Sequence, residues 1–199
     1  MKKRIVALKR KTKETDITVK LNIDGTGKTK INTGIGILNN MLELFAFHGL
    51  FDLEIQAKGD VKKIDIHHTN EDVGIVLGEA FKKALGDKES IKRFGSASVP
   101  MEDAVANVTV DISGRGFFKE KSFSFTYQGE YSFDYANHFF EAFAKKLEIN
   151  LNIDLFPSSN HDLHTNLEPV FKALGLALDQ ATQIDPRRKG IPSTKGVID

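Results

Sequence analysis

The stretch "HHTNEDVGIVLGEAFKKALG" (residues 67–86) decides the fold, because the near copy "LHTNLEPVFKALGLALDQA" (residues 163–181) follows in the second half of the chain. Each copy has a histidine, His67 or His164, at or next to its start and a glutamate four residues after that histidine. Apolar residues at helical spacing follow in both. The sequence therefore predicts two helices, each with a polar cluster at its start. We expect Thr69 to cap the first helix and Pro169 to lie in the first turn of the second.

Each of these helices follows another predicted helix and a strand, so the same order of elements occurs twice. Further alternating strands are predicted at residues 14–24 and 103–113. No linker separates the halves, which predicts an α+β fold with one sheet and helices on one side of it in each half. We expect residues 1–199 to form a single compact unit, with halves of approximately 1–92 and 93–199. The preceding helix and strand of each half are expected at residues 37–49 and 51–60, and at residues 133–147 and 149–156.

The composition restricts the class of protein. With 40% hydrophobic residues and 15 Phe, the chain can fill a core. Its 28 Lys and Arg nearly balance 27 Asp and Glu, so we expect neither nucleic acid nor a membrane surface as a partner. The absence of cysteine excludes disulfides and thiol catalysis. No signal peptide or membrane span is evident, and we expect a cytoplasmic protein.

The histidines and glutamates suggest metal binding. His67 and His68 precede Glu71 by four and three residues, so at the start of a helix they can converge on one point. Imidazole and carboxylate together suit a transition metal, and carboxylates favour Mn²⁺. One such cluster could equally be a capped helix with solvated polar side chains. The second cluster, His164 with Glu168, favours metal.

Other motifs concern anions. "GTGKT" (residues 25–29) resembles the end of a P-loop, but the earlier glycine is missing and no helix is predicted after it, so a hairpin turn is the preferred interpretation. Arg93, Arg115 and the segment "IPSTKG" (residues 191–196) offer cations and hydroxyls. Together with a metal cluster, they suggest a small phosphorylated substrate.

The chain resembles a known family in a series of ordered motifs that covers nearly its whole length. These are "RKTKETDITVKLNIDG", "INTGIGILNNML", "FHGLFDLEIQAKGD", "DIHHTNEDVGIVLG", "RFG", "PMEDA", "VDISGR", "EPVFKALGLAL" and "IPSTKG". In this order they are similar to imidazoleglycerol-phosphate dehydratases. The resemblance implies a duplicated fold of the ribosomal protein S5 domain 2-like type. It also implies dehydration of D-erythro-imidazole glycerol phosphate to imidazole acetol phosphate in histidine biosynthesis, two Mn²⁺ ions per active site, and a homo-24-mer with sites between subunits.

The resemblance also implies roles for individual residues. Glu14 matches a catalytic acid or base, and His48 a residue close to the substrate. The positions that match metal ligands are His67, His68, Glu71, His138, His164 and Glu168. The positions that match substrate-binding residues, chiefly for the phosphate, are Arg93, Arg115, Lys172, Ser193, Thr194 and Lys195.

Two further ligand positions differ from the family pattern. Asn40 and Thr165 stand where histidines are usual. If the halves are exchanged by internal symmetry, one site contains His67, Glu71, His138 and Thr165, and the other Asn40, His68, His164 and Glu168. Each site then lacks one imidazole. His161 could replace it, but an exposed histidine at the start of the helix is the preferred interpretation of that residue. Two hypotheses follow: an active dehydratase with altered metal sites, or a catalytically weakened paralogue or variant that keeps the fold and the assembly.

Overall fold

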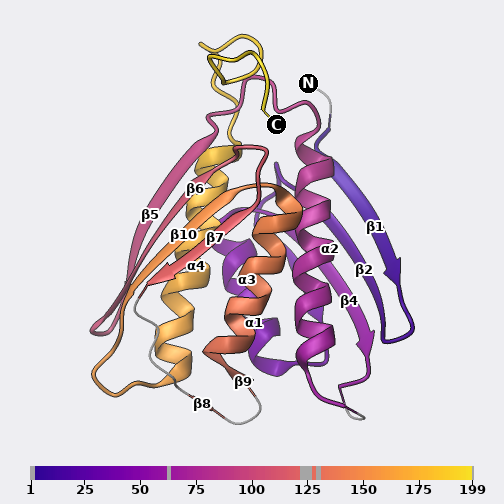
Figure 1. Ribbon diagram of the computed structural model, residues 1–199, viewed down its shortest axis with the longest axis vertical. Coiled ribbons are helices and arrows are strands. Elements are labelled where there is room, and N and C mark those ends of the chain that lie inside the picture. The colour runs from indigo at the N-terminus through magenta and orange to yellow at the C-terminus, as the bar shows by residue number, and fades with distance from the viewer. Residues whose placement is uncertain (1–2, 62–63, 122–126, 129–130, 199) are drawn as a thin grey trace.

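The computed structural model describes residues 3–61, 64–121, 127–128 and 131–198. Two four-stranded sheets dominate it, with the orders β1-β2-β4-β3 and β5-β6-β10-β7 (Figure 1). The first contains β1 (Ile5–Lys11), β2 (Thr15–Asn22), β3 (Thr29–Asn32) and β4 (Asp52–Gly59). The second contains β5 (Phe94–Met101), β6 (Ala104–Asp111), β7 (Phe117–Lys121) and β10 (Asn150–Phe156). A small pair, β8 (Tyr127–Gln128) and β9 (Tyr131–Ser132), precedes the third helix.

The two sheets are built in the same way. In each, the first two strands form an antiparallel hairpin, the fourth strand in chain order pairs antiparallel with the second, and the third pairs parallel with the fourth. Alternate residues of β2 and β6 are buried, as their alternating sequences predict. The predicted α+β duplication is confirmed.

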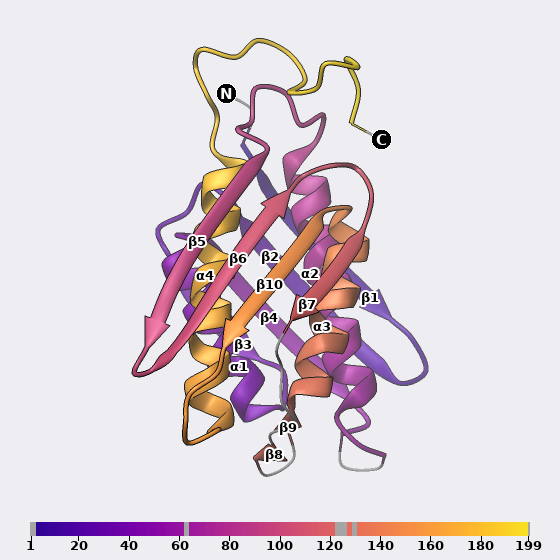
Figure 2. The ribbon, with the colours of Figure 1, turned by 60° about the vertical axis from the view of Figure 1, so that its left-hand side comes forward.

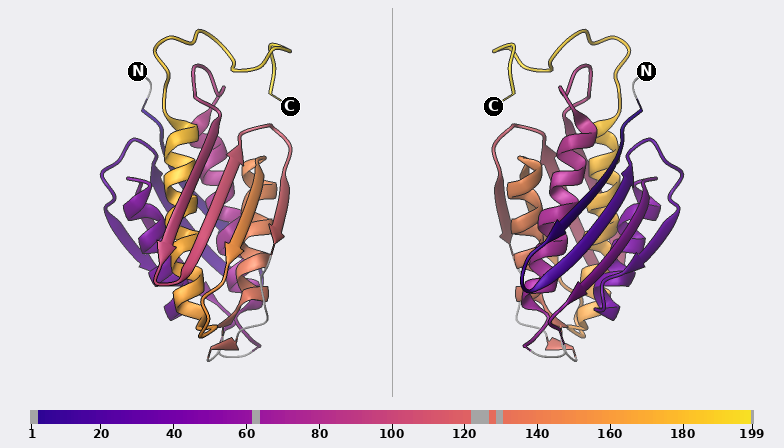
Figure 3. Two further views of the ribbon diagram at one scale, coloured as in Figure 1. Left: turned by 90° about the vertical axis from the view of Figure 1, so that its left-hand side faces the viewer. Right: turned by 90° about the vertical axis from the view of Figure 1, so that its right-hand side faces the viewer.

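Four helices lie between the sheets: α1 (Gly36–His48), α2 (His67–Leu85), α3 (Phe133–Leu147) and α4 (Leu163–Thr182) (Figures 2 and 3). Helix α2 packs against α3, and α1 packs against α4. Each half therefore contributes one helix to each pair. None of the helices in the described residues is long and apolar enough to cross a membrane.

Glycine permits the same close helix contact in both pairs. A Cβ on Gly78 of α2 would lie 2.6 Å from the carbonyl oxygen of Phe143, and one on Gly175 of α4 would lie 2.3 Å from that of Phe45. Gly78 follows His67 at the same interval as Gly175 follows His164. Phe143 and Phe45 follow His138 and Asn40 at equal intervals, and their rings lie 6.3 Å apart in the core. The two halves are thus related in register by an internal two-fold arrangement.

Three local expectations were wrong. Thr69 does not cap α2: the helix begins at His67, whose backbone N–H donates to Asp65 Oδ1 at 2.8 Å. Pro169 lies within α4 beyond its first turn, because that helix begins at Leu163. The loop at residues 23–28 is not a hairpin turn, since β4 separates β2 from β3 in the sheet.

Candidate active site

The first cluster lies at the start of α2 and consists of His67, Glu71 and His138. His67 Nε2 lies 3.6 Å from Glu71 Oε2 on the next turn of the helix. His138 comes from α3, and its ring centroid lies 4.8 Å from that of His67. The packing of α2 on α3 therefore brings together one helical His–Glu pair and an imidazole from a distant part of the sequence.

The ring centroid of His68 lies 5.9 Å from that of His67, but its Nδ1 bonds to Asp60, before α2, and not to the first cluster. Its Nδ1 lies 3.0 Å from Asp60 Oδ2 and 4.0 Å from Glu14 Oε2. The hydrogen bond with Asp60 raises the pKa of His68, against a smaller opposing effect of burial. A hydrogen bond at Nδ1 leaves Nε2 as the nitrogen available to a ligand. The structure therefore places His68 beside the predicted catalytic Glu14.

Buried hydrogen bonds tie the start of α2 to α3. Asn70 Nδ2 donates to the carbonyl of Tyr135 at 2.6 Å, and Tyr131 OH donates to Asn70 Oδ1 at 2.8 Å. Burial raises the pKa of Tyr131, so its hydroxyl remains protonated and able to donate. These bonds fix the spacing of the histidines on the two helices.

The second cluster lies at the start of α4 and consists of Asn40, His164 and Glu168. His164 Nε2 lies 3.2 Å from Glu168 Oε2, and Lys172 Nζ lies 2.5 Å from Glu168 Oε1. Burial opposes ionisation of Glu168, but Lys172 and His164 outweigh it and lower the pKa. All three cluster residues line one pocket of about 580 Å³, whose other lining residues are Gly36, Ile37 and Leu44.

Thr165 does not face the second cluster. Its backbone N–H and its hydroxyl both donate to Asp162 Oδ2, at 2.7 and 2.9 Å, and the residue is buried. Asp162 is the N-cap of α4, and these bonds satisfy the start of the helix. Thr165 therefore acts as part of a helix cap in this chain. His161, considered as a replacement ligand, lies exposed in the preceding loop.

The two predicted catalytic residues lie beside different clusters. His48 is the last residue of α1, and its pKa is lowered by partial burial and by the charge of Lys172, against an opposing effect of Glu168. It therefore belongs with the second cluster, whereas Glu14 lies beside His68. A substrate that reaches both residues must bridge the two environments or use two copies of the chain.

The predicted phosphate-binding residues, apart from Lys172, lie at the other end of the molecule. Figure 1 shows α2 and α4 starting at one end and the C-terminal segment at the opposite end. A helix of 19 residues, the length of α2, spans about 28 Å. Arg93 donates to Asp111 at 2.7 and 3.2 Å and to the carbonyl of Pro192 at 3.0 Å, which holds Ser193 nearby. Arg115, Thr194 and Lys195 are exposed at this end.

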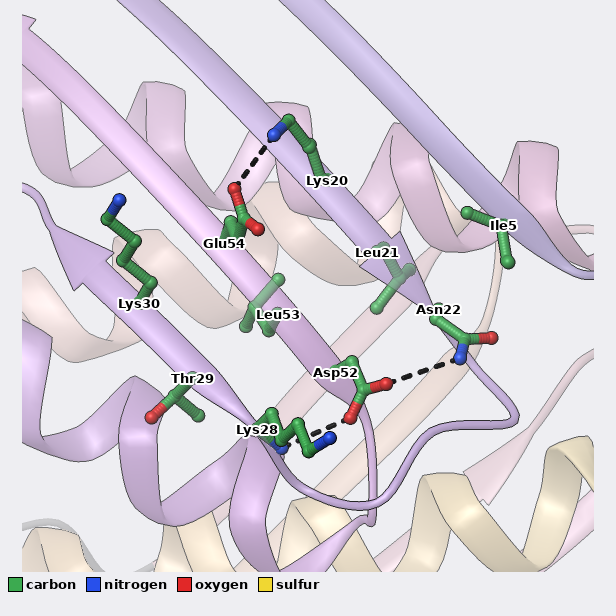
Figure 4. A pocket seen from close by; sticks show the side chains of 10 residues that line it. All are labelled: Ile5, Lys20, Leu21, Asn22, Lys28, Thr29, Lys30, Asp52, Leu53 and Glu54. Atoms are coloured by element: carbon green, nitrogen blue, oxygen red, sulfur yellow. Dashed lines mark hydrogen bonds and ion pairs between the residues drawn. The ribbon is translucent and has the colours of Figure 1, made fainter.

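The loop that resembled a P-loop binds a carboxylate of its own chain. The backbone N–H groups of Thr26 and Lys28 donate to Asp52 Oδ1 at 2.8 and 3.1 Å. Figure 4 shows the bond from Lys28. These bonds lower the pKa of Asp52, against a smaller effect of burial. A strand, β3, follows the loop rather than a helix. The phosphate interpretation of this loop is therefore excluded, as the sequence indicated.

The clusters are not finished metal centres within one chain. In the part of the chain that the structure describes, no three His, Cys, Asp or Glu side chains are placed so that they could hold an ion. Each cluster needs a side-chain rotation or a further donor. His68 faces outward from the first cluster and could supply such a donor to a second copy.

Sequence reasoning missed the aspartates that organise both helix starts. Asp60 holds His68, Asp65 accepts the first N–H of α2, and Asp162 caps α4. All three lie between a strand and a His-led helix, and Asp162 precedes Thr165 at the spacing of a capping residue. That spacing was the available signal for Asp162. The partner of Asp60 could not be read from spacing, because Asp60 lies before α2 and not on the same helix as His68.

Comparisons with known proteins agree with this architecture. The family model described as imidazoleglycerol-phosphate dehydratase matches residues 33–178. The chain is 53% identical over 192 residues to the imidazoleglycerol-phosphate dehydratase of Thermoanaerobacter pseudethanolicus, covering 96% of this chain and 97% of that one. It is 49% identical over 196 residues to that of Pelobacter propionicus, covering 98% and 99%.

Two solved structures share the fold. The imidazoleglycerol-phosphate dehydratase of Staphylococcus aureus superposes with a TM-score of 0.80 at 33% identity, covering 91% of this chain and 99% of that one. That of Pyrococcus furiosus, in complex with (S)-C348, gives 0.81 at 35% identity, covering 96% and 99%. The chain therefore belongs to the imidazoleglycerol-phosphate dehydratase family.

Proposed function

We propose that the chain dehydrates D-erythro-imidazole glycerol phosphate to imidazole acetol phosphate, a step of histidine biosynthesis in the cytoplasm. Membership of the family makes it a hydro-lyase. The observation that carries the proposal is the pair of His–Glu contacts, 3.6 and 3.2 Å long, at the starts of two helices related by the internal repeat. No observation favours the weakened paralogue: Glu14 lies beside His68, and His48 lies beside the second cluster.

The residues present fit a pair of Mn²⁺ ions by their chemistry. One set is His67, Glu71 and His138, and the other is Asn40, His164 and Glu168. Imidazole and carboxylate donors suit this ion. Asn40 Oδ1 is buried and has no hydrogen-bond partner in the described residues, as expected of an oxygen reserved for a ligand. When bound, the ions supply Lewis acidity towards the imidazole ring of the substrate.

Glu14 and His48 have different parts in the proposed reaction. The hydrogen to be removed is on the second carbon from the imidazole ring, and the carboxylate of Glu14 accepts it as a proton. The hydroxyl group on the carbon next to the ring gains a proton and leaves as water. The enol that remains takes up a proton on the carbon next to the ring and becomes the ketone of the product. His48 lies close to the substrate, and its lowered pKa keeps the imidazole neutral at neutral pH.

Phosphate binding supports an active site shared between copies. Arg93, Arg115, Ser193, Thr194 and Lys195 hold the phosphate in this proposal, together with Lys172. Five of these six lie at the opposite end from the clusters, so one chain cannot apply them all to a small substrate. His68 also needs a partner copy. A homo-24-mer, the assembly implied by the family resemblance, provides such contacts.

The test is turnover of imidazole glycerol phosphate by metal-free protein with and without added Mn²⁺. We expect activity only with the metal, and a chelator should lower the midpoint of thermal unfolding. An ion present at about 100 times its Kd adds about 2.7 kcal/mol, or roughly 5–10 °C for a chain of this size. Sedimentation with metal present should show a large homo-oligomer. Activity that is unchanged after chelation would contradict the metal requirement, and a monomer would contradict the shared site.

A further inference from the structure

Asp72 of α2 binds both strands of the first hairpin. Its side chain is a buried carboxylate in the second turn of the helix. Thr15, the first residue of β2, donates its hydroxyl to Asp72 Oδ2 at 2.5 Å. Arg10 Nη1, from β1, lies 2.6 Å from Asp72 Oδ1. Each strand therefore contributes one polar group to the same carboxylate, on either side of the turn that carries Glu14.

The turn between β1 and β2 is held closed by Thr12. Its backbone N–H donates to the carbonyl of Thr15 at 2.8 Å, and its hydroxyl accepts bonds from the N–H groups of Glu14 and Thr15 at 3.1 and 3.0 Å. The backbone of Glu14 is thus fixed relative to Thr15. Because Thr15 also bonds to Asp72, the position of Glu14 relative to α2 depends on that bond.

Asp72 lies on the face of α2 that meets this turn. His68 and Asp72 are four residues apart and share a helix face, and His68 Nδ1 lies 4.0 Å from Glu14 Oε2. The side chain of Glu14 is 54% exposed, so packing around the side chain does little to place it. The placement of the Glu14 carboxylate therefore depends on where its backbone is held.

The second half has the same hairpin and helix without this polar contact. Its strands β5 and β6 pair in the same register as β1 and β2, and α4 packs on them as α2 packs on β1 and β2. Apolar residues occupy the three equivalent positions, with Val99 for Arg10, Ala104 for Thr15 and Pro169 for Asp72. A hairpin thus packs on its helix without a charged pair, so the pair in the first half is not needed for this packing.

We propose that Asp72 is a positioning residue for the dehydration: through Thr15 and Arg10 it holds the turn between β1 and β2 against α2, and so keeps the carboxylate of Glu14 beside His68. The inference rests on the proposed function, which makes Glu14 the proton acceptor. An acceptor must lie within reach of the proton that it removes, and a displacement of about 1 Å can lower the rate roughly 100-fold. Asp72 thus acts on the rate through Glu14.

The experiment compares two variants of the full-length assembly. Thr15→Val loses the hydroxyl and keeps the shape of the side chain, whereas Thr15→Ser keeps the hydroxyl. With Mn²⁺ and imidazole glycerol phosphate, Thr15→Val should lower kcat roughly 10- to 100-fold, with little change in KM or in the number of bound Mn²⁺ ions. Thr15→Ser should retain most of the native kcat. Lys9→Met is the control, since it removes an exposed ion pair with Asp16 within the same hairpin and should leave kcat unchanged.

A second comparison uses the Glu14→Gln background. A residue that acts through Glu14 has no further effect once that carboxylate is absent, so Thr15→Val should leave the residual kcat of Glu14→Gln unchanged. A general loss of structure would lower kcat in both backgrounds alike. Asp72→Asn keeps the shape of the side chain and one oxygen acceptor, and it should show the same pattern to a smaller degree. This variant carries the test if Thr15→Val does not assemble in sedimentation.

The outcomes separate the inference from the proposed function. An unchanged kcat in Thr15→Val, or equal losses in the native and Glu14→Gln backgrounds, would overturn the inference and leave the proposed function intact. A Glu14→Gln variant with the native kcat would overturn both the role of Glu14 and the inference. Loss of bound Mn²⁺ in Thr15→Val would show that the contact supports the metal ligands instead, and would also overturn the inference.

Discussion

The starts of α2 and α4 share a backbone plan and differ in how their polar side chains are used. At α2, Asn70 bonds across to α3, and His68 reaches outward to Asp60 beside Glu14. At α4, Asn166 bonds back to Ser158 and to the carbonyl of Asp162 in its own loop. The helix packing is thus the same in both halves. At the start of α2 the imidazole of His68 bonds to Asp60, whereas at the start of α4 Thr165 is part of the helix cap.

The charge beside each glutamate differs as well. Four residues after Glu168 comes Lys172, which pairs with it, whereas four residues after Glu71 comes Ile75. The second cluster therefore carries a cation of its own, and the first does not. His48 lies near that lysine, which helps to keep its imidazole neutral. In the proposed mechanism, the proton acceptor Glu14 therefore lies beside His68, and the neutral His48 lies beside the second cluster.

The largest effect should come from replacing Glu14, which lies beside His68 at the start of α2. Glu14 and Asp103 immediately precede β2 and β6, the equivalent strands of the two halves. Glu14→Gln removes the proposed proton acceptor and should lower kcat roughly 10²- to 10⁴-fold while Mn²⁺ binding is retained. Asp103 accepts a bond from the backbone N–H of Ser159 at 2.9 Å, and Asp103→Asn is the matched control. An unaltered kcat in Glu14→Gln would remove this residue from the mechanism.

A smaller effect is expected at the opposite end of the molecule. Arg115→Ala and Lys195→Ala should each raise KM for the phosphorylated substrate roughly 10- to 100-fold, because a hydrogen bond to a charged group contributes about 1.5–3 kcal/mol. Inorganic phosphate should lose potency as an inhibitor to the same degree. Arg187→Ala is the control, since its exposed guanidinium is paired with Asp185. If kcat fell with KM unchanged, these residues would not serve binding.

The smallest effect is expected from the hydrogen bond that Tyr131 donates to Asn70 at the start of α2. Tyr131→Phe leaves Asn70 Oδ1 without its donor and should lower the free energy of unfolding by about 1–3 kcal/mol at neutral pH. The folded state raises the pKa of Tyr131, so its contribution is complete below the unfolded value of about 10 and declines as the pH rises above it. Denaturant unfolding should show the native protein and the variant converging in alkali. A constant difference up to pH 11 would contradict this account.

Much of the fold was predictable because the signals are local and occur twice. Helix α3 has the predicted bounds, and α2 and α4 end within one residue of theirs. The His–Glu pairs are also local, since residues four apart share a helix face. The bonds of Asn70 to Tyr131 and of His68 to Asp60 were not predictable, because they join segments separated by loops. Asn40 and Thr165 look alike as substitutions in the sequence, yet one lines a pocket and the other caps a helix.

The sequence by itself determined the family, the duplicated order of elements and the residue types available for chemistry. Only the tertiary structure decided which of those residues meet. It separated His67 from His68, placed His48 and Glu14 beside different clusters, and put the C-terminal hydroxyls at the end opposite the helix starts (Figure 1). The physical reason is that spacing along one helix fixes neighbours only within a turn or two, whereas the packing of helices between two sheets fixes which distant side chains share a pocket.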